Sequence, residues 1–194
     1  MEVGKFLNMG IKINKIDDTT TKILLAVVLI AFAITLRLAP LPHNFAPIAA
    51  VAIFGGAILP RRWALTLPLV AMVVTDAVLG FHSLMWVVYA TFVAIAFASN
   101  LGIKKIGVSN IIGGSMAASV FFFVTTNFAV WAEGRLYPGT FEGLMSSYFN
   151  ALPFFRNTLL GDLVFSAALF GSYALVYRHV LNGKKALKIA EITR

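Results

Sequence analysis

The sequence predicts an all-α membrane protein with six transmembrane helices, and three observations lead to this fold class. The chain is 59% hydrophobic and 12% charged, with a mean hydropathy of +0.86, whereas soluble domains carry about 25% charged residues. Six apolar runs follow one another along its 194 residues. The basic residues fall in short clusters between these runs, which is typical of the loops that orient a membrane protein. The net charge of +8 therefore does not indicate nucleic-acid binding.

The six apolar runs differ in length and in their helix-breaking residues. A transmembrane helix needs about 20 residues, within a range of about 17–25. The second run is shorter, begins near Pro47 and contains Gly55 and Gly56, so we expect a helix that is tilted, broken or extended by its neighbours. Pro68 interrupts the third run, and such breaks persist where other helices or a cavity satisfy the freed backbone groups. The predicted spans are residues 23–39, 46–59, 63–79, 84–101, 111–131 and 158–177.

Thirteen of the sixteen Lys and Arg residues lie on one side of this topology. Four precede the first span, two follow the second, two follow the fourth and five follow the sixth, which leaves Arg37, Arg135 and Arg156 on the other side. Because cytoplasmic loops carry the excess of Lys and Arg, both termini are predicted to be cytoplasmic. The chain then divides into an N-terminal cytoplasmic segment, a six-helix domain and a basic cytoplasmic tail: residues 1–22, 23–178 and 179–194.

Two segments outside the spans have amphipathic patterns. Residues 3–16 mix apolar residues with lysines, which predicts either an interfacial helix or an unstructured tail. In the last external loop, apolar residues recur at helical spacing over residues 140–151, which predicts a short amphipathic helix. This helix is either an interfacial anchor or a lid over a binding pocket. Tyr148 and Phe155 are the candidate lid residues.

Polar residues are predicted to gather in the external half of four helices. Arg37 ends the first span, Asp76 lies about one turn below the external end of the third, and Asn127 and Asp162 lie at similar depths in the fifth and sixth. Carboxylates in lipid are costly and usually face the interior of the bundle. Two interpretations stay open: ion pairs that hold the helices in register, or a polar pocket open to the outside. The candidate ligand-binding residues are Arg37, Asn44, Asp76, His82, Asn127, Trp131, Arg156, Asn157 and Asp162.

Several kinds of chemistry have no motif in this chain. The phosphate-binding pattern G-x-x-x-x-G-K-[ST] is missing, so the chain does not power transport by ATP hydrolysis alone. The patterns G-x-S-x-G and H-E-x-x-H of serine and zinc hydrolases are also missing. With no cysteine, thiolate metal sites are excluded. No cofactor is predicted, and a metal site at His43 and His82 with a nearby carboxylate stays undecided.

Five stretches carry the most distinctive residue patterns: LPHNFAPI at residues 41–48, FGGA at 54–57, TDAVLGFH at 75–82, TNFAVW at 126–131 and NALPFFRNTLLGD at 150–162. These stretches resemble an uncharacterised bacterial family of small six-helix membrane proteins. The resemblance covers most of residues 23–178, and the last stretch is its most specific part. In size, helix number, cytoplasmic termini and an external polar pocket, that family is similar to the substrate-binding (S) components of energy-coupling-factor vitamin transporters.

The resemblance implies a non-enzymatic protein of the bacterial inner membrane that binds a small polar or vitamin-like molecule near the external face. Its partners would be the lipid bilayer, the ligand and a separate membrane coupling subunit with two ATPases. Arg37 or Arg156 would pair with an anionic ligand group, and Trp131 would stack on the ligand. Two alternatives stay open: a membrane-embedded enzyme acting on a lipid or isoprenoid, and a purely structural assembly subunit.

Overall fold

The protein is almost entirely helical. The computed structural model describes the backbone of residues 11–12 and 18–192 and the side chains of residues 18–177. A two-residue strand β1 (Ile11–Lys12) pairs antiparallel with β2 (Lys105–Ile106). Apart from this pair, the predicted all-helical architecture is confirmed. The six helices are α2 (Thr19–Leu38), α3 (Ile48–Ile58), α4 (Arg61–Leu79), α5 (Met85–Gly102), α6 (Val108–Ala132) and α7 (Phe141–Ile192).

Five of these helices are long and apolar enough to cross a membrane: α2, α4, α5, α6 and the part of α7 from Phe141 to Tyr177. Large apolar side chains cover their surfaces, as in α6, where Ile112, Met116 and Val120 are all exposed at one-turn spacing. An exposed apolar face of this extent is stable in lipid and costly in water. The five helices therefore indicate a multi-pass membrane protein.

The second predicted span is corrected by the structure. Helix α3 has 11 residues, all of them buried, and a helix of that length rises only about 17 Å, against a hydrocarbon core of about 30 Å. Gly56, one of the two glycines in this run, explains how α3 fits into the core. A Cβ at Gly56 would lie 2.5 Å from the carbonyl oxygen of Ala96, so only glycine lets α3 approach α5 this closely. Helix α3 is a core element that its neighbours cover.

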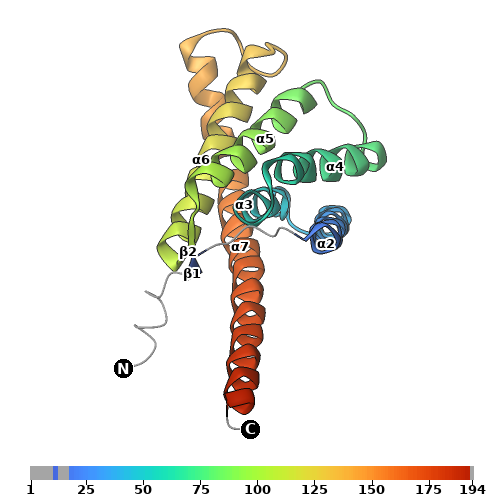
Figure 1. Cartoon of the computed structure of the whole chain (residues 1–194). Coiled ribbons are helices and arrows are strands. Elements are labelled where there is room, and N and C mark those ends of the chain that lie inside the picture. Colours follow the sequence, from blue (N-terminus) through green and yellow to red (C-terminus); the bar gives the residue numbers. More distant parts are fainter. Residues whose placement is uncertain (1–10, 13–17, 193–194) are drawn as a thin grey trace.

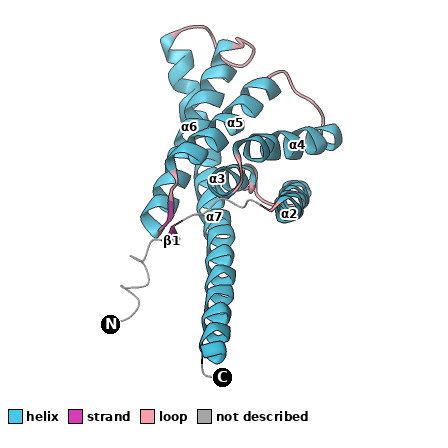
Figure 2. Ribbon diagram, in the orientation of Figure 1, coloured by secondary structure: helices cyan, strands magenta, loops and turns pink. Residues whose placement is uncertain are grey.

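The helices cross one another and do not form a parallel bundle (Figure 1). Helices α6 and α7 lie side by side along the long direction of the view, α5 is inclined to them, α4 lies across, and α2 is seen nearly along its axis. Helix α3 lies at the centre and packs against α4, α5 and α7. The loops that join these helices, drawn pink in Figure 2, are short by comparison. The packing centre includes Phe54 of α3, whose ring meets that of Phe170 of α7 at 5.0 Å between centroids.

Helix α2 begins four residues earlier than the apolar run predicts. Asp18 is its N-cap, and its carboxylate accepts a hydrogen bond of 2.6 Å from the backbone N–H of Thr21. Carboxylates suit this position because the first backbone N–H groups of a helix have no partner within it. Lys22 is consequently a helical residue. Of the amphipathic segment at residues 3–16, all but residues 11 and 12 lie outside the described residues.

Helix α7 differs most from its predicted form. Residues 141–151 are helical, but they are the first turns of α7 and not a separate helix. The chain continues through Pro153 as one helix, although a proline inside a helix removes one backbone hydrogen bond and crowds the carbonyl group four residues earlier. Most of the predicted tail at residues 179–194 is also helical backbone, up to Ile192.

Candidate functional site

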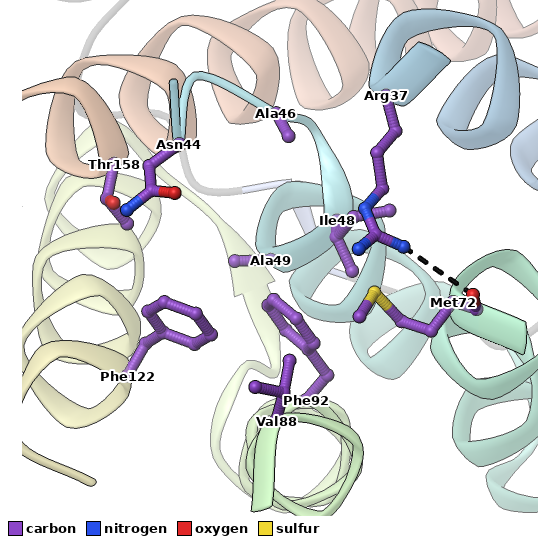
Figure 3. Close-up of a pocket in the computed structure, with 10 residues that line it drawn as sticks. All are labelled: Arg37, Asn44, Ala46, Ile48, Ala49, Met72, Val88, Phe92, Phe122 and Thr158. Atoms are coloured by element: carbon purple, nitrogen blue, oxygen red, sulfur yellow. Dashed lines mark hydrogen bonds between the residues drawn. The ribbon is translucent and has the colours of Figure 1, made fainter. Parts of the chain in front are cut away.

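A cavity of about 110 Å³, which we call the first cavity, is lined by at least one residue from each of the six helices. Its walls are mainly apolar, with three polar side chains. In Figure 3, Asn44 and Thr158 lie together on one side, Arg37 lies on the opposite side, and the rings of Phe92 and Phe122 lie below them in the view. Those two rings stack, with centroids 5.1 Å apart. The complete lining is Arg37, Asn44, Ala46, Ile48, Ala49, Met72, Val88, Phe92, Phe122 and Thr158.

The second cavity adjoins the first and has a volume of about 220 Å³. The two share a wall made of Asn44, Val88, Phe122 and Thr158. The second cavity extends between α6 and the first turns of α7. Asn127 donates from Nδ2 to the carbonyl oxygen of Phe123 at 2.8 Å, which leaves its side-chain oxygen and one N–H for a ligand. The other lining residues are Phe123, Thr126, Asn127, Val130, Ala151, Phe154 and Phe155.

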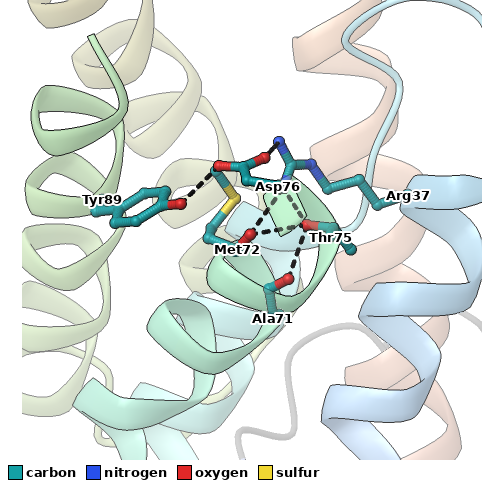
Figure 4. Close-up of polar contacts among 6 residues, drawn as sticks. All are labelled: Arg37, Ala71, Met72, Thr75, Asp76 and Tyr89. Carbon is teal, nitrogen blue, oxygen red and sulfur yellow. Dashed lines mark hydrogen bonds and ion pairs between the residues drawn. The ribbon is translucent and has the colours of Figure 1, made fainter. Parts of the chain in front are cut away.

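Arg37 is held in place by α4. Its Nη2 lies 2.7 Å from Oδ1 of Asp76, and its Nη1 donates to Oγ1 of Thr75. Tyr89 of α5 donates its hydroxyl to Oδ2 of Asp76 at 2.7 Å, so both carboxylate oxygens are bound (Figure 4). We call Arg37, Thr75, Asp76 and Tyr89 the Arg37 cluster.

The Arg37 cluster carries little net charge toward the cavity. The side chain of Asp76 is 2% exposed and that of Arg37 is 19% exposed. A buried carboxylate with a cation and a hydroxyl on its two oxygens is well solvated by the protein. Because Asp76 already balances Arg37, an anionic ligand would compete with Asp76. The ion-pair interpretation of Arg37 and Asp76 therefore describes their geometry, while Arg37 also lines the first cavity.

The loop between α2 and α3 contributes Asn44 to the shared wall of the two cavities. Asn44 has a φ of 62°, in the left-handed region that asparagine tolerates better than most residues. Asn157 of α7 donates from Nδ2 to the carbonyl oxygen of His43 at 3.0 Å and ties the loop to that helix. Residue 161 is glycine where the loop crosses α7, and a Cβ there would lie 3.4 Å from the Cα of Phe45. These contacts fix Asn44 beside Thr158.

The second buried aspartate belongs to a different cluster. Asp162 is 1% exposed, and its Oδ2 lies 2.6 Å from the hydroxyl oxygen of Ser119 on α6. Beside them, Ser115 of α6 donates its hydroxyl to that of Ser166 of α7 at 2.9 Å. We call Asp162, Ser119, Ser115 and Ser166 the Asp162 cluster. The structure thus places Asp76 and Asp162 with different partners on different helices.

The other candidate residues have other positions. His82 and Arg156 are exposed, and neither lines the two cavities. Trp131 donates its indole N–H to the carbonyl oxygens of Pro138 and Thr140, at 3.0 and 3.1 Å, and so fastens the loop between α6 and α7. Tyr148 donates its hydroxyl to the carbonyl oxygen of Val124 at 3.0 Å.

Phe155 lines the second cavity, with its ring 4.7 Å from that of Phe123 between centroids. Among the described residues, no group of three or more His, Cys, Asp or Glu side chains is placed to hold a metal ion.

Sequence reasoning missed several lining residues. Thr158 stands at the start of the predicted sixth span, one turn before Asp162 on the same face of α7. That one-turn spacing from an intramembrane carboxylate is the signal that would have found it. Phe92 and Phe122 gave no such signal, because an aromatic ring in an apolar helix usually packs in the core or faces lipid. Thr75 and Tyr89 are recognised only as hydrogen-bond partners, Thr75 of Arg37 and Tyr89 of Asp76.

Comparison with known proteins gives a family and no function. Residues 17–187 match a family described as a family of unknown function, DUF6580. The match spans most of the chain, so the protein belongs to that family. No curated protein and no solved structure matches it.

Proposed function

We propose that this chain is a membrane-embedded binding protein for the uptake of a small, neutral, ring-containing molecule with polar edges, similar to the S components of vitamin transporters. The observation that carries the proposal is the pair of adjoining cavities around Asn44, with volumes of about 110 and 220 Å³. Ligand pockets are mostly apolar and aromatic with a few placed polar groups. These cavities have that composition.

The ligand chemistry follows from the walls. The stacked rings of Phe92 and Phe122 and the ring of Phe155 offer flat surfaces to a ring system. Asn44 and Thr158 offer both donor and acceptor groups. Arg37 is already paired with Asp76, which favours a neutral ligand over a carboxylate or phosphate.

In the proposed orientation both termini are cytoplasmic, which requires α3 and the residues on either side of it together to return the chain across the membrane between α2 and α4. The Lys and Arg excess then lies on the cytoplasmic side, and the cavities are reached from the external side of the bacterial inner membrane. The first turns of α7, with Tyr148 and Phe155, are the proposed lid. A coupling subunit with ATPases is the proposed energy source, since the chain has no phosphate-binding loop of its own.

The two alternatives have less support. A lipid-processing enzyme would need paired carboxylates within reach of one reacting group, and Asp76 and Asp162 have separate partners. A purely structural subunit would need no cavity, and it offers no reason for polar side chains from α2, α7 and the loop before α3 to line one.

Mass spectrometry of small molecules released from the gently purified protein tests the proposal. We expect one recurrent compound in the wild type and its loss in Asn44→Gly, where glycine keeps the positive φ and removes the amide. Thr158→Val, which keeps the shape and removes the hydroxyl, should lose at least half of the compound. Arg156→Gln is the matched control, since its exposed side chain lines neither cavity. Equal recovery from all four proteins would show that the compound binds elsewhere.

A further inference from the structure

Asp162 lies in the interior of the protein between two apolar helices. It is 1% exposed, on the part of α7 that is apolar enough to cross a membrane. Its side chain reaches α6, where the hydroxyl of Ser119 lies 2.6 Å from Oδ2. Thr158, one turn earlier, lines both cavities, whereas Asp162 lines neither. An ionisable group buried in a membrane-spanning helix is a candidate functional residue by default, and the cavities give Asp162 no role.

No cation neutralises Asp162 within the described residues. Neither α6 nor α3, which pack against α7, contains a charged residue. The loop before α3 carries His43, whose ring lies against Phe154, about two turns from Asp162. Helix α2 reaches α7 through Phe32, and its Arg37 is bound to Asp76.

Helix α7 itself supplies no partner either. Arg156 is its nearest charged residue among those with described side chains, and it is exposed. An ionised Asp162 would therefore be stabilised by a single hydroxyl group, that of Ser119, in an interior of low dielectric constant. Buried groups in that situation neutralise instead of remaining charged.

The proton count at Ser119 agrees with a neutral Asp162. The hydroxyl oxygen of Ser119 lies 2.9 Å from the carbonyl oxygen of Ser115 and 2.6 Å from Asp162. A serine hydroxyl has one proton, so it donates one of these two bonds. If the Asp162 carboxyl group carries a proton, it donates to Ser119 while Ser119 donates to the carbonyl of Ser115. Both contacts are then hydrogen bonds at once, and 2.6 Å is a normal length for a short O–H···O bond.

We propose that Asp162 is a reversible proton-binding site at the interface of α6 and α7. When these helices are packed as in this structure, the carboxyl group of Asp162 is protonated and donates a hydrogen bond to Ser119. Release of this proton leaves an uncompensated carboxylate between two uncharged helix faces. That state becomes favourable only when α6 and α7 admit water. Proton occupancy of Asp162 therefore controls how tightly these two helices pack.

Infrared spectroscopy of the full-length protein in detergent micelles tests this, by the C=O stretch of protonated carboxylic acids at pH 7. We expect one such band in the wild type and its complete loss in Asp162→Asn. Asp76→Asn is the matched control: Asp76 is equally buried but paired with Arg37, so the band should remain. A wild type without the band, or a band that survives Asp162→Asn, would overturn the proposal.

A second variant keeps the test decisive should Asp162→Asn fail to fold. Ser119→Ala removes the acceptor and keeps the acid, so the band should move to higher frequency without losing intensity. Raising the pH in the wild type should abolish the band and, over the same pH range, increase hydrogen exchange of the α6 amides around Ser119 beyond its intrinsic pH dependence. The proposal would be wrong if the band frequency were unchanged in Ser119→Ala. It would also be wrong if the band disappeared at high pH without any change in the hydrogen exchange of the α6 amides.

Discussion

The two buried aspartates show how neighbours decide the charge state of one residue type. Asp76 and Asp162 are each 1% exposed, and each has a hydroxyl group close to one carboxyl oxygen, that of Tyr89 at 2.7 Å and that of Ser119 at 2.6 Å. Asp76 also has the guanidinium of Arg37 at 2.7 Å. Asp162 has no such partner among the described residues. Burial and hydrogen bonding are therefore matched, and the cation is the difference.

That difference separates two tasks that a buried carboxylate can perform. In the Arg37 cluster the charges join α2 to α4, and Tyr89 adds α5. An ionised pair of this kind holds its helices in one arrangement. In the Asp162 cluster, uncharged hydroxyl and carboxyl groups join α6 to α7. This second contact can be switched by a single proton, whereas the first cannot be altered without breaking an ion pair.

The largest effect is expected for Arg37→Met, which keeps an unbranched apolar stem and removes the guanidinium group with its charge. Asp76 is then a buried carboxylate without a cation, a change that costs about 3–5 kcal/mol in comparable pairs. Because Arg37 is partly exposed, we expect the lower end of that range. Thermal unfolding of the purified protein in detergent measures it. Adding Asp76→Leu should restore most of the loss, and failure of this double variant to recover stability would show that Arg37 acts through its cavity contacts and not through Asp76.

An intermediate effect is expected for Ser119→Ala. It removes the hydroxyl that contacts both Asp162 and the carbonyl oxygen of Ser115, at an expected cost of about 1.5 kcal/mol. The same unfolding measurement applies. Ser146→Ala, an exposed hydroxyl of α7, is the control and should be neutral. A loss as large as that of Arg37→Met would mean that Asp162 is charged, and the comparison between the two clusters would fail.

A small effect is expected for Asp162→Asn, below about 1 kcal/mol, because an amide donates to Ser119 much as a protonated carboxyl group does. The same substitution at Asp76 should cost about 2 kcal/mol more, since it leaves the charge of Arg37 unbalanced. The difference between the two variants in unfolding temperature is the measurement. Equal losses of stability at both positions would contradict the assignment of Asp76 as ionised and Asp162 as neutral.

The smallest effect is expected at Asp18, an exposed carboxylate that serves as a reference for the two buried aspartates. Its hydrogen bonds with Thr21 lower its pKa below the ordinary value of 3.8. A lowered pKa means that the carboxylate stabilises the start of α2 at neutral pH, and that this contribution is lost as the pH falls below 3.8. Amide hydrogen exchange at Thr21, corrected for its intrinsic pH dependence, should show protection fading over that range. In Asp18→Asn the protection should not depend on pH.

The helices were more predictable than the way they pack. Apolar runs located all six helices, and five of these are long enough to span a membrane, since long stretches of lipid-compatible side chains leave few other structures. The second run was as apolar as the others, and its length was the signal that it forms a short core helix. That α3 packs on α5 through Gly56 depends on the carbonyl of Ala96, 40 residues away in the chain, and no local pattern contains this.

The candidate site was predictable in its residue types and not in its pairings. Arg37 and Asp76 were both candidates, but their contact with each other, and not with Arg156 or Asp162, depends on how α2 crosses α4. The aromatic walls were hidden among seventeen phenylalanines, most of which serve lipid contact or packing equally well. Polar residues in an apolar chain stand out in sequence, whereas apolar residues around a cavity do not.

Helix α7 has a practical consequence for imaging this protein. A continuous helix of 52 residues is about 78 Å long, whereas a bilayer with its head groups is about 40–45 Å thick. Part of α7 must therefore project beyond the lipid, as a continuous extension of the part of the same helix that carries Asp162. A 21.0 kDa membrane protein offers few features for aligning particle images. A helical fusion partner joined in register after Ile192 would supply a rigid fiducial whose orientation reports that of the membrane core.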